Sequence, residues 1–203
     1  MSSADFAHWE TRYATPEYLY GTEPNAFLEA HRGLLPKSGK ALAVADGEGR
    51  IGVWLAAQGL DVLSVDFSPK AQAKAKALAA RRSVVMRFVQ ADLTAWDWST
   101  AEFDLVVAIF IQFAAPPERR RIFAGICQAL KPGGLLLLQG YRREQIAYKT
   151  GGPSEIENLY SEAMLREDFG SFTKLDIKAH DSVIREGARH TGMAAVVDLV
   201  GWK

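Results

Sequence analysis

The sequence predicts an α/β fold, in which a mostly parallel seven-stranded sheet carries helices on both faces and ends in an antiparallel hairpin. Three observations indicate this class: short apolar runs alternate with helical segments of about 10 to 15 residues, a glycine-rich turn follows the first run, and no helical pattern separates the last two runs. This alternation favours right-handed crossovers, so the loops at the carboxyl ends of the parallel strands are expected to line one crevice.

Five apolar runs are expected to form the parallel part of the sheet. The run KALAVA at 40–45 precedes the glycine turn, and apolar residues then recur at helical spacing from Gly52 to Ala56. Ser68 and Pro69 cap and open a second helix that runs to about Arg82. A third helix opens at Pro116 and stops before Pro132. The strands are predicted at 40–45, 62–65, 84–89, 103–110 and 135–138.

The pattern changes after Tyr141. A capping box formed by Ser154 and Glu157 predicts a helix that ends near Gly170. Two strand-like runs at 173–178 and 194–200 then have no helix between them, so they are expected to pair as an antiparallel hairpin. A chain of 203 residues is within the range of one domain.

The charge and cysteine content argue against several classes of protein, although a local basic patch is still compatible with the balanced charge. The 24 Lys and Arg residues balance the 24 Asp and Glu residues, so the chain lacks the basic excess that drives non-specific nucleic-acid binding. The lone Cys127 cannot form an internal disulfide, and the four histidines show no metal-ligand spacing. No leader pattern or long apolar stretch is present. We therefore expect a cytoplasmic protein with no metal, no nucleic-acid partner and no membrane association.

The turn after the first strand reads Gly47-Glu48-Gly49-Arg50-Ile51-Gly52, which has the form G-x-G-x-x-G. Glycines at these positions let backbone amides approach a ligand at a helix N-terminus. The same glycines can also serve only the packing of strand against helix, and this alternative stays open at the level of sequence.

Two aspartates follow the next two strands. Asp66 lies about 20 residues beyond the glycine turn, where a carboxylate accepts hydrogen bonds from both hydroxyls of a ribose. Asp92 follows the third strand and is placed to accept from an exocyclic amino group such as that of adenine. Each aspartate can also act only as a cap or turn residue. Together with the glycine turn, they predict a ligand that contains adenosine.

Sequence blocks along nearly the whole chain resemble those of one family. They are WETRY at 9–13, YGTEPN at 20–25, GEGR at 47–50, VD at 65–66, ADL at 91–93, LKPGG at 130–134, TGGP at 150–153, and EG at 186–187 with His190 and Gly192. In these blocks the chain resembles the small class I S-adenosylmethionine-dependent methyltransferases related to the tellurite-resistance and thiopurine methyltransferases.

The resemblance implies a Rossmann-like class I methyltransferase fold, with S-adenosylmethionine as cofactor and S-adenosylhomocysteine as product. It divides the single domain 1–203 into an N-terminal cap over the cofactor (1–33), a cofactor-binding core (34–140) and a part with the substrate-side helix and hairpin (141–203). The implied cofactor-binding residues are Trp9, Tyr13, Tyr20, Asp46, Gly47, Glu48, Gly49, Asp66, Phe67, Ser68, Asp92, Leu93, Ala108 and Phe110.

By the same resemblance, Gly47 and Gly49 approach the methionine part, Asp66 the ribose, Asp92 and Leu93 the adenine, and Phe110 the space near the sulfonium. The acidic residue usual in the first strand is replaced around Ala43. Either Asp46 or the backbone alone then holds the methionine amino group. Three aromatic residues have two alternative roles, namely Trp9, Tyr13 and Tyr20. They either close over the sulfonium cation, which aromatic faces attract, or pack in the hydrophobic core.

The expected acceptor is a small molecule such as a thiol or a metalloid oxyanion. Methyl transfer is an in-line displacement that needs mainly proximity and orientation. Three catalytic candidates are His190, which could take a proton, Arg189, which could hold an anion, and Tyr141; all three can equally just order the hairpin loop. Residues 109–112 read IFIQ and lack the Asn/Asp-Pro-Pro-aromatic signature of many nucleic-acid amino methyltransferases. A monomer or homodimer is expected.

Two alternative functions remain at the level of sequence. An NAD(P)-dependent oxidoreductase would use the same glycine turn and Asp66, although no Tyr-x-x-x-Lys pair is present to deliver a proton. A non-catalytic S-adenosylmethionine-binding protein would keep the fold and sense the methyl donor. A second cavity beside the methyl group, faced by Gln112, Tyr141 and His190, would favour the enzyme.

Overall fold

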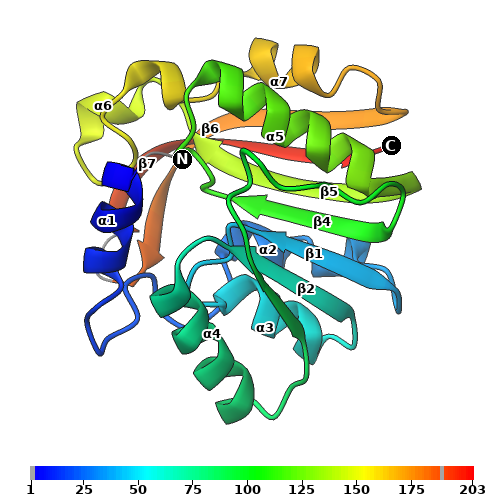
Figure 1. Ribbon diagram of the computed structural model, residues 1–203. Helices are drawn as coiled ribbons and strands as arrows, with labels where there is room; N and C mark the ends of the chain where they lie inside the picture. The colour runs from blue at the N-terminus through cyan, green and yellow to red at the C-terminus, as the bar shows by residue number, and fades with distance from the viewer. Residues whose placement is uncertain (1–2, 188–189) are drawn as a thin grey trace.

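A computed structural model describes residues 3–187 and 190–203. The seven strands form one sheet in the order β3-β2-β1-β4-β5-β7-β6 (Figure 1). β1 to β5 are parallel, whereas β7 is antiparallel to both β5 and β6. The strands are β1 (Lys40–Val44), β2 (Asp61–Asp66), β3 (Arg87–Gln90), β4 (Phe103–Ile109), β5 (Leu130–Tyr141), β6 (Lys174–Glu186) and β7 (His190–Trp202). The predicted sheet and its C-terminal antiparallel hairpin are confirmed.

Helices cover both faces of the sheet. They are α1 (Ser3–Arg12), α2 (Ala26–Ala30), α3 (Arg50–Ala57), α4 (Pro69–Arg81), α5 (Pro116–Ala129), α6 (Gln145–Tyr148) and α7 (Glu162–Asp168), with 3-10 turns η1 (Arg32–Leu34) and η2 (Ile156–Asn158). Among the described residues, no helix combines the length and apolarity that crossing a membrane requires.

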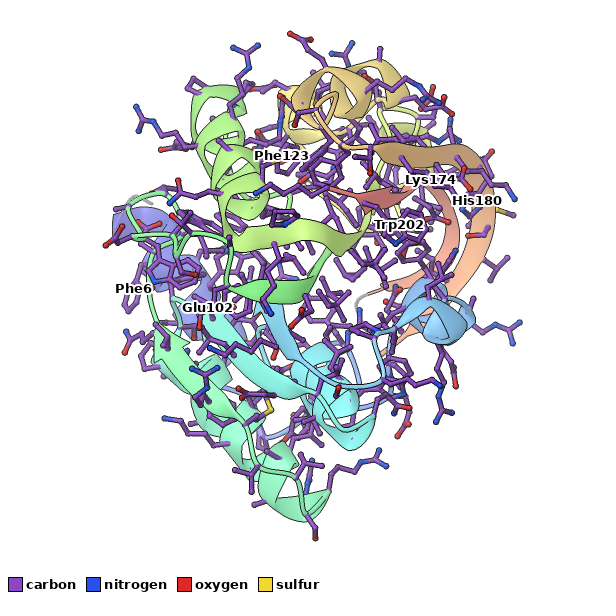
Figure 2. All side chains as sticks on the ribbon, turned by 90° about the vertical axis from the view of Figure 1, so that its right-hand side faces the viewer. Phe6, Glu102, Phe123, Lys174, His180 and Trp202 are labelled. Atoms are coloured by element: carbon purple, nitrogen blue, oxygen red, sulfur yellow. The ribbon has the colours of Figure 1, made fainter. Side chains whose placement is uncertain are left out.

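Two apolar layers hold the helices to the sheet. On one face, Phe123 of α5 and Leu165 of α7 pack with Val106 of β4, and Figures 1 and 2 show α5 lying over this face. On the other face, Leu28 of α2 and Leu55 of α3 pack with further strand residues. Because the central strands are covered on both sides, their sequences are apolar almost throughout.

The predicted helix start at Ser154 is wrong, whereas the predicted end near Gly170 agrees with α7, which ends at Asp168. Residues 156–158 form the turn η2, and α7 begins only after Ser161, whose Oγ accepts from the Met164 amide at 3.2 Å. Tyr160 is the physical reason, because its amide donates to the Tyr141 carbonyl at 2.9 Å and its ring is buried in the core. This pairing with the end of β5 leaves residue 160 out of any helix, and the hydroxyl of Ser154 instead contacts Glu155.

Other boundaries also differ from the prediction. β3 begins at Arg87 instead of at residue 84. The two hairpin strands have 13 residues each, well beyond the predicted runs 173–178 and 194–200. β6 is an edge strand in which exposed and less exposed positions alternate. Because polar residues occupy the exposed positions, a search for apolar runs detects only part of this strand.

Candidate functional site

A cleft of about 960 Å³ lies at the carboxyl ends of β1, β2, β4 and β5. Its walls come from α1, the segment around Tyr20, the turn after β1, residues 109–113 and the loop 149–155. In the order of the sheet, β1 and β4 are neighbours whose chain connections run in opposite directions. Ligands in open α/β sheets bind at such a switch point.

Gly47 and Asp66 meet at the floor of this cleft. The Gly47 amide donates to Asp66 Oδ2 at 2.8 Å, and the Ser68 amide donates to Asp66 Oδ1 at 2.9 Å. Burial raises the pKa of Asp66 to about 6 in spite of these bonds. Gly47 has a φ of 56°, and a Cβ there would lie 3.0 Å from the Tyr13 hydroxyl. The backbone of Gly47, which carries no side chain, therefore borders the cleft beside the Asp66 carboxylate.

The other two glycines of the motif serve packing. A Cβ on Gly49 would lie 2.6 Å from the Cβ of Ala75 in α4, and one on Gly52 would lie 2.5 Å from Asp46 Oδ2. Gly49 is absent from the cleft wall among the described residues. The packing alternative thus accounts for Gly49 and Gly52, whereas Gly47 is the glycine of the motif that borders the cleft.

Asp46 lies at the cleft but uses its carboxylate internally. Oδ1 accepts from the Gly52 amide at 3.0 Å and Oδ2 accepts from Ser64 Oγ at 2.6 Å. Burial is the largest influence on this group and raises the pKa of Asp46 to about 6. These contacts fix the start of α3 on β2.

Glu48, the variable position between the glycines, forms a buried ion pair. Its carboxylate contacts Lys74 Nζ at 2.7 Å and accepts from the Leu19 amide at 2.7 Å, and the residue is 4% exposed. Glu48 therefore joins the glycine turn both to α4 and to the N-terminal segment.

Aromatic side chains form the wall from α1 and the following segment. Trp9 stacks on Tyr13 with ring centroids 5.6 Å apart, and Tyr20 lies in the same cluster. The Arg12 guanidinium lies 4.9 Å from the centre of the Trp9 ring and donates to the Tyr20 hydroxyl at 3.3 Å. All four line the cleft. Phe67, also in the wall, contacts Phe6 of α1 edge-on.

The wall at β4 and β5 is built around Phe110 and Tyr141. Their rings stack with centroids 4.5 Å apart, and Phe110 adopts a φ of 55°, which is uncommon for a residue with a side chain. Gln112 holds this wall, since its Nε2 donates to the carbonyls of Tyr141 and Asn158 at 2.9 and 3.1 Å and its Oε1 accepts from the Tyr141 amide. Burial raises the pKa of Tyr141 well above its ordinary value.

Several predicted cofactor residues lie outside the described cleft wall. Leu93 and Ala108 are buried in the core that faces α5, and Ser68 is the buried N-cap of α4 with its hydroxyl accepting from the Ala71 amide at 3.0 Å. Asp92 accepts from the amide and hydroxyl of Thr94, which is the contact of a turn residue. The contacts of Asp92 and Leu93 to adenine, and the contacts of Ser68 and Ala108 to the cofactor, stay predictions.

The catalytic candidates differ in how the structure presents them. Tyr141 lies in the cleft wall. His190 begins β7, while its side chain and the whole of Arg189 lie outside the described residues. Thr191, one residue further along β7, borders the cleft. Within residues 3–187 and 190–203, no group of three or more His, Cys, Asp or Glu side chains is placed to bind a metal ion.

Sequence reasoning missed Arg12, Arg50 and Asn158 as cleft residues. Arg12 had a usable signal, because it follows Trp9 by three residues and the two share one face of a helix. Arg50 stands at a variable position of the glycine motif, and Asn158 ends the short 3-10 turn η2, so neither position carries a periodic pattern.

Comparison with known proteins identifies a domain type for the central part of the chain. Residues 41–134 match the family model described as a methyltransferase domain. An uncharacterized methyltransferase of Synechocystis is 32% identical over 105 residues, which are 51% of this chain and 48% of that protein. An uncharacterized protein of Mycobacterium tuberculosis is 30% identical over 98 residues, 48% of this chain and 35% of that protein. The chain thus matches less than half of the length of these curated relatives.

Solved structures share the fold over most of the chain. A SAM-dependent methyltransferase from Methanosarcina mazei superposes with a TM-score of 0.69 at 18% identity, covering 89% of this chain and 98% of that one. TehB from Haemophilus influenzae superposes with a TM-score of 0.67 at 15% identity, covering 98% and 66%. Residues 41–134 therefore match a methyltransferase domain, and the chain has the Rossmann-like class I fold seen in the solved S-adenosylmethionine-dependent methyltransferase.

Proposed function

We propose that the protein transfers the methyl group of S-adenosylmethionine to a small-molecule acceptor. The observation that carries this proposal is that one cleft contains both the Gly47–Asp66 pair and the Phe110–Tyr141 wall. The first is suited to an adenosyl ligand, and the second borders space for an acceptor. A volume of about 960 Å³ is at the upper end of small-molecule sites, which is consistent with two ligands held side by side.

The residues of the cleft fit S-adenosylmethionine. Asp66 presents a carboxylate to the ribose hydroxyls, and the bare backbone at Gly47 lets the methionine part approach closely. Arg12 supplies a cation for the methionine carboxylate; its described contacts are Tyr20, His8 and the Trp9 ring, and no carboxylate is among them. The aromatic faces of Trp9 and Tyr13 suit a sulfonium cation.

The side chains act mainly by orientation. When bound, S-adenosylmethionine supplies an electrophilic methyl group on an excellent leaving group. The stacked Phe110 and Tyr141 rings set one wall and exclude water, and Gln112 fixes both through the backbone. A tyrosine phenol is protonated at neutral pH, and burial moves the pKa of Tyr141 further from neutral, so in this proposal Tyr141 positions an acceptor without serving as a base. A soft nucleophile needs no more than this.

The acceptor class follows from the same features. A thiol, a metalloid oxyanion or a similar small nucleophile fits a reaction without a strong base, and His190 or Arg189 would assist a substrate that needs a proton acceptor or a cation. The absence of net charge on the chain argues against nucleic acid. In this proposal the protein is cytoplasmic and acts as a monomer or a homodimer.

Calorimetric titration tests the cofactor assignment. The protein is titrated with S-adenosylmethionine, S-adenosylhomocysteine and NAD, and the titrations are repeated on Asp66→Ala. We expect micromolar binding of both adenosyl ligands, loss of binding in the variant and no response to NAD. Tight NAD binding with no response to S-adenosylmethionine would instead overturn the methyltransferase proposal and favour the oxidoreductase alternative.

An activity screen separates an enzyme from a sensor. Release of S-adenosylhomocysteine is measured with panels of thiols, metalloid oxyanions and amines. Turnover with any of them supports the enzyme. Tight cofactor binding combined with no turnover across the panels, and with a cleft that a bound cofactor fills completely in a crystal structure, favours the non-catalytic binding protein.

A further inference from the structure

A buried ion pair connects the glycine turn to the C-terminal hairpin. Arg50 Nη2 and Glu186 Oε2 lie 2.6 Å apart, and both residues are 8% exposed. Arg50 is the first residue of α3 and borders the cleft, whereas Glu186 is the last residue of β6 and is not part of the described cleft wall. The pair thus joins a cleft residue to a residue behind the cleft.

The same two side chains hold the N-terminal segment. Arg50 Nη1 donates to the Tyr20 carbonyl at 3.3 Å. Glu186 Oε1 accepts from Asn25 Nδ2 at 2.7 Å and from the Ala26 amide at 3.4 Å. The segment 20–26 is therefore attached at both ends to one buried ion pair. The Glu186 carboxylate binds Asn25 and Ala26 directly, and it binds Tyr20 through Arg50.

The turn after Glu186 adds a steric contact. A Cβ on Gly187, which has a φ of 64°, would lie 2.7 Å from the Gly21 nitrogen and collide with the backbone of Leu19 and Tyr20. The hairpin turn and residues 19–21 are thus packed backbone against backbone. Thr191, which donates to the Gly187 carbonyl at 2.8 Å, continues this contact into the cleft wall.

The attached segment forms part of the cofactor wall. Tyr20 and Gly21 line the cleft, and the Tyr20 hydroxyl accepts from Arg12, whose guanidinium lies over Trp9. A shift of the Tyr20 backbone would therefore move Arg12 and Trp9 as well. Rigid support of contact residues by buried partners is what fixes binding geometry.

We propose that Glu186 is a positioning residue for the cofactor: through Arg50 and Asn25 it holds the segment 20–26 against the cleft, so the C-terminal hairpin sets cofactor affinity without touching the cofactor. This inference rests on the proposed function. The family model ends at residue 134, so this role falls outside the segment that it matches.

The test compares Glu186→Gln and Glu186→Asp with the control Asp104→Asn. Asp104 also belongs to an ion pair, with Lys131 at 2.8 Å, but it lies at the amino end of β4, away from the cleft. S-adenosylhomocysteine affinity is measured by calorimetry at pH 7.5, and hydrogen exchange is followed in the peptides that span residues 15–26.

For Glu186→Gln we expect S-adenosylhomocysteine affinity to fall by about tenfold, as for a displaced contact group, with faster exchange in residues 15–26. Glu186→Asp should recover part of the affinity because it keeps the charge. Asp104→Asn should bind as the wild type does. If Glu186→Gln does not fold, Glu186→Asp provides the same comparison with a displaced carboxylate.

The outcomes separate the two claims. A wild-type protein that does not bind S-adenosylhomocysteine overturns the proposed function. A wild type that binds, together with folded Glu186 variants of unchanged affinity and unchanged exchange in residues 15–26, overturns the positioning role and leaves the proposed function standing.

Discussion

The Asp66 carboxylate accepts a hydrogen bond from the Gly47 amide at 2.8 Å, so the end of β2 is joined to the turn that follows β1. Two strand ends are thereby fixed at one point of the cleft floor. The bond also means that a ligand which uses the carboxylate depends on its ionisation. Because burial raises the pKa of Asp66 to about 6, this dependence falls within an accessible pH range.

We expect S-adenosylhomocysteine affinity to fall as pH drops through 6. Ribose hydroxyls donate more strongly to the ionised carboxylate, and a group with a pKa of about 6 is mostly ionised at pH 7 and mostly protonated at pH 5. The loss should be about tenfold between these two pH values. Calorimetry at both values should show a flat profile for Asp66→Asn and the wild-type profile for Asp61→Asn, which alters the far end of β2. An Asp66→Asn profile as steep as that of the wild type would assign the titration to another group.

Asp46 should make the folded state less stable as pH rises. Its folded pKa of about 6 lies above the ordinary value of 3.8, so between these values the unfolded chain releases a proton that the folded chain retains. The contribution of Asp46 to the free energy of unfolding should therefore decrease by about 2 kcal/mol from pH 4 to pH 6. Above pH 6 this contribution should stay small.

Urea unfolding at pH 4.5 and pH 7 checks this sign. The stability of Asp46→Asn relative to the wild type should increase between the two pH values. Glu102→Gln is the matched control, because the Lys40 partner holds the pKa of that carboxyl below its ordinary value and its contribution runs in the opposite direction. A relative stability of Asp46→Asn that does not change with pH would contradict the assignment.

The order of strands and helices could be predicted because it depends on local sequence patterns. β1, β4 and α4 follow from apolar runs and from the Ser68-Pro69 start, which need no tertiary information. The predicted helix start at Ser154 is wrong because Tyr160 pairs with Tyr141, a contact that depends on where β5 ends in space. A local capping signal cannot compete with a buried ring and a backbone bond to the sheet.

The residues of the candidate site also differ in whether local sequence could predict them. Gly47 and Asp66 could be predicted because both follow apolar strands at a spacing that parallel sheets bring together. The ion pair of Glu48 with Lys74 could not, since it joins a variable position of the motif to a lysine on the next helix. Arg50 and Glu186 are 136 positions apart, and their pairing depends on the sheet order alone.

Gly47→Ala and Gly59→Ala should separate backbone strain from ligand approach. Both glycines have positive φ values, 56° and 93°, so alanine should lower stability at either position by about 1 kcal/mol. A Cβ at residue 59 meets open space, whereas one at residue 47 enters the cleft 3.0 Å from the Tyr13 hydroxyl. Thermal unfolding should show similar losses, and calorimetry should show weaker S-adenosylhomocysteine binding only for Gly47→Ala. Equal affinities in the two variants would exclude close approach at Gly47.

Trp9→Ala should reduce the affinity for S-adenosylmethionine more than that for S-adenosylhomocysteine. Trp9 stacks on Tyr13 in the cleft wall, and an aromatic face attracts the sulfonium cation but gains nothing comparable from the neutral thioether of the product. The expected excess loss is about 1 kcal/mol, close to a fivefold change in the ratio of the two dissociation constants. Trp54→Ala, one turn further along α3 and outside the described cleft wall, should leave the ratio unchanged. If Trp9→Ala weakens both ligands equally, Trp9 acts by packing against Tyr13, and the cation must be held by other groups of the cleft.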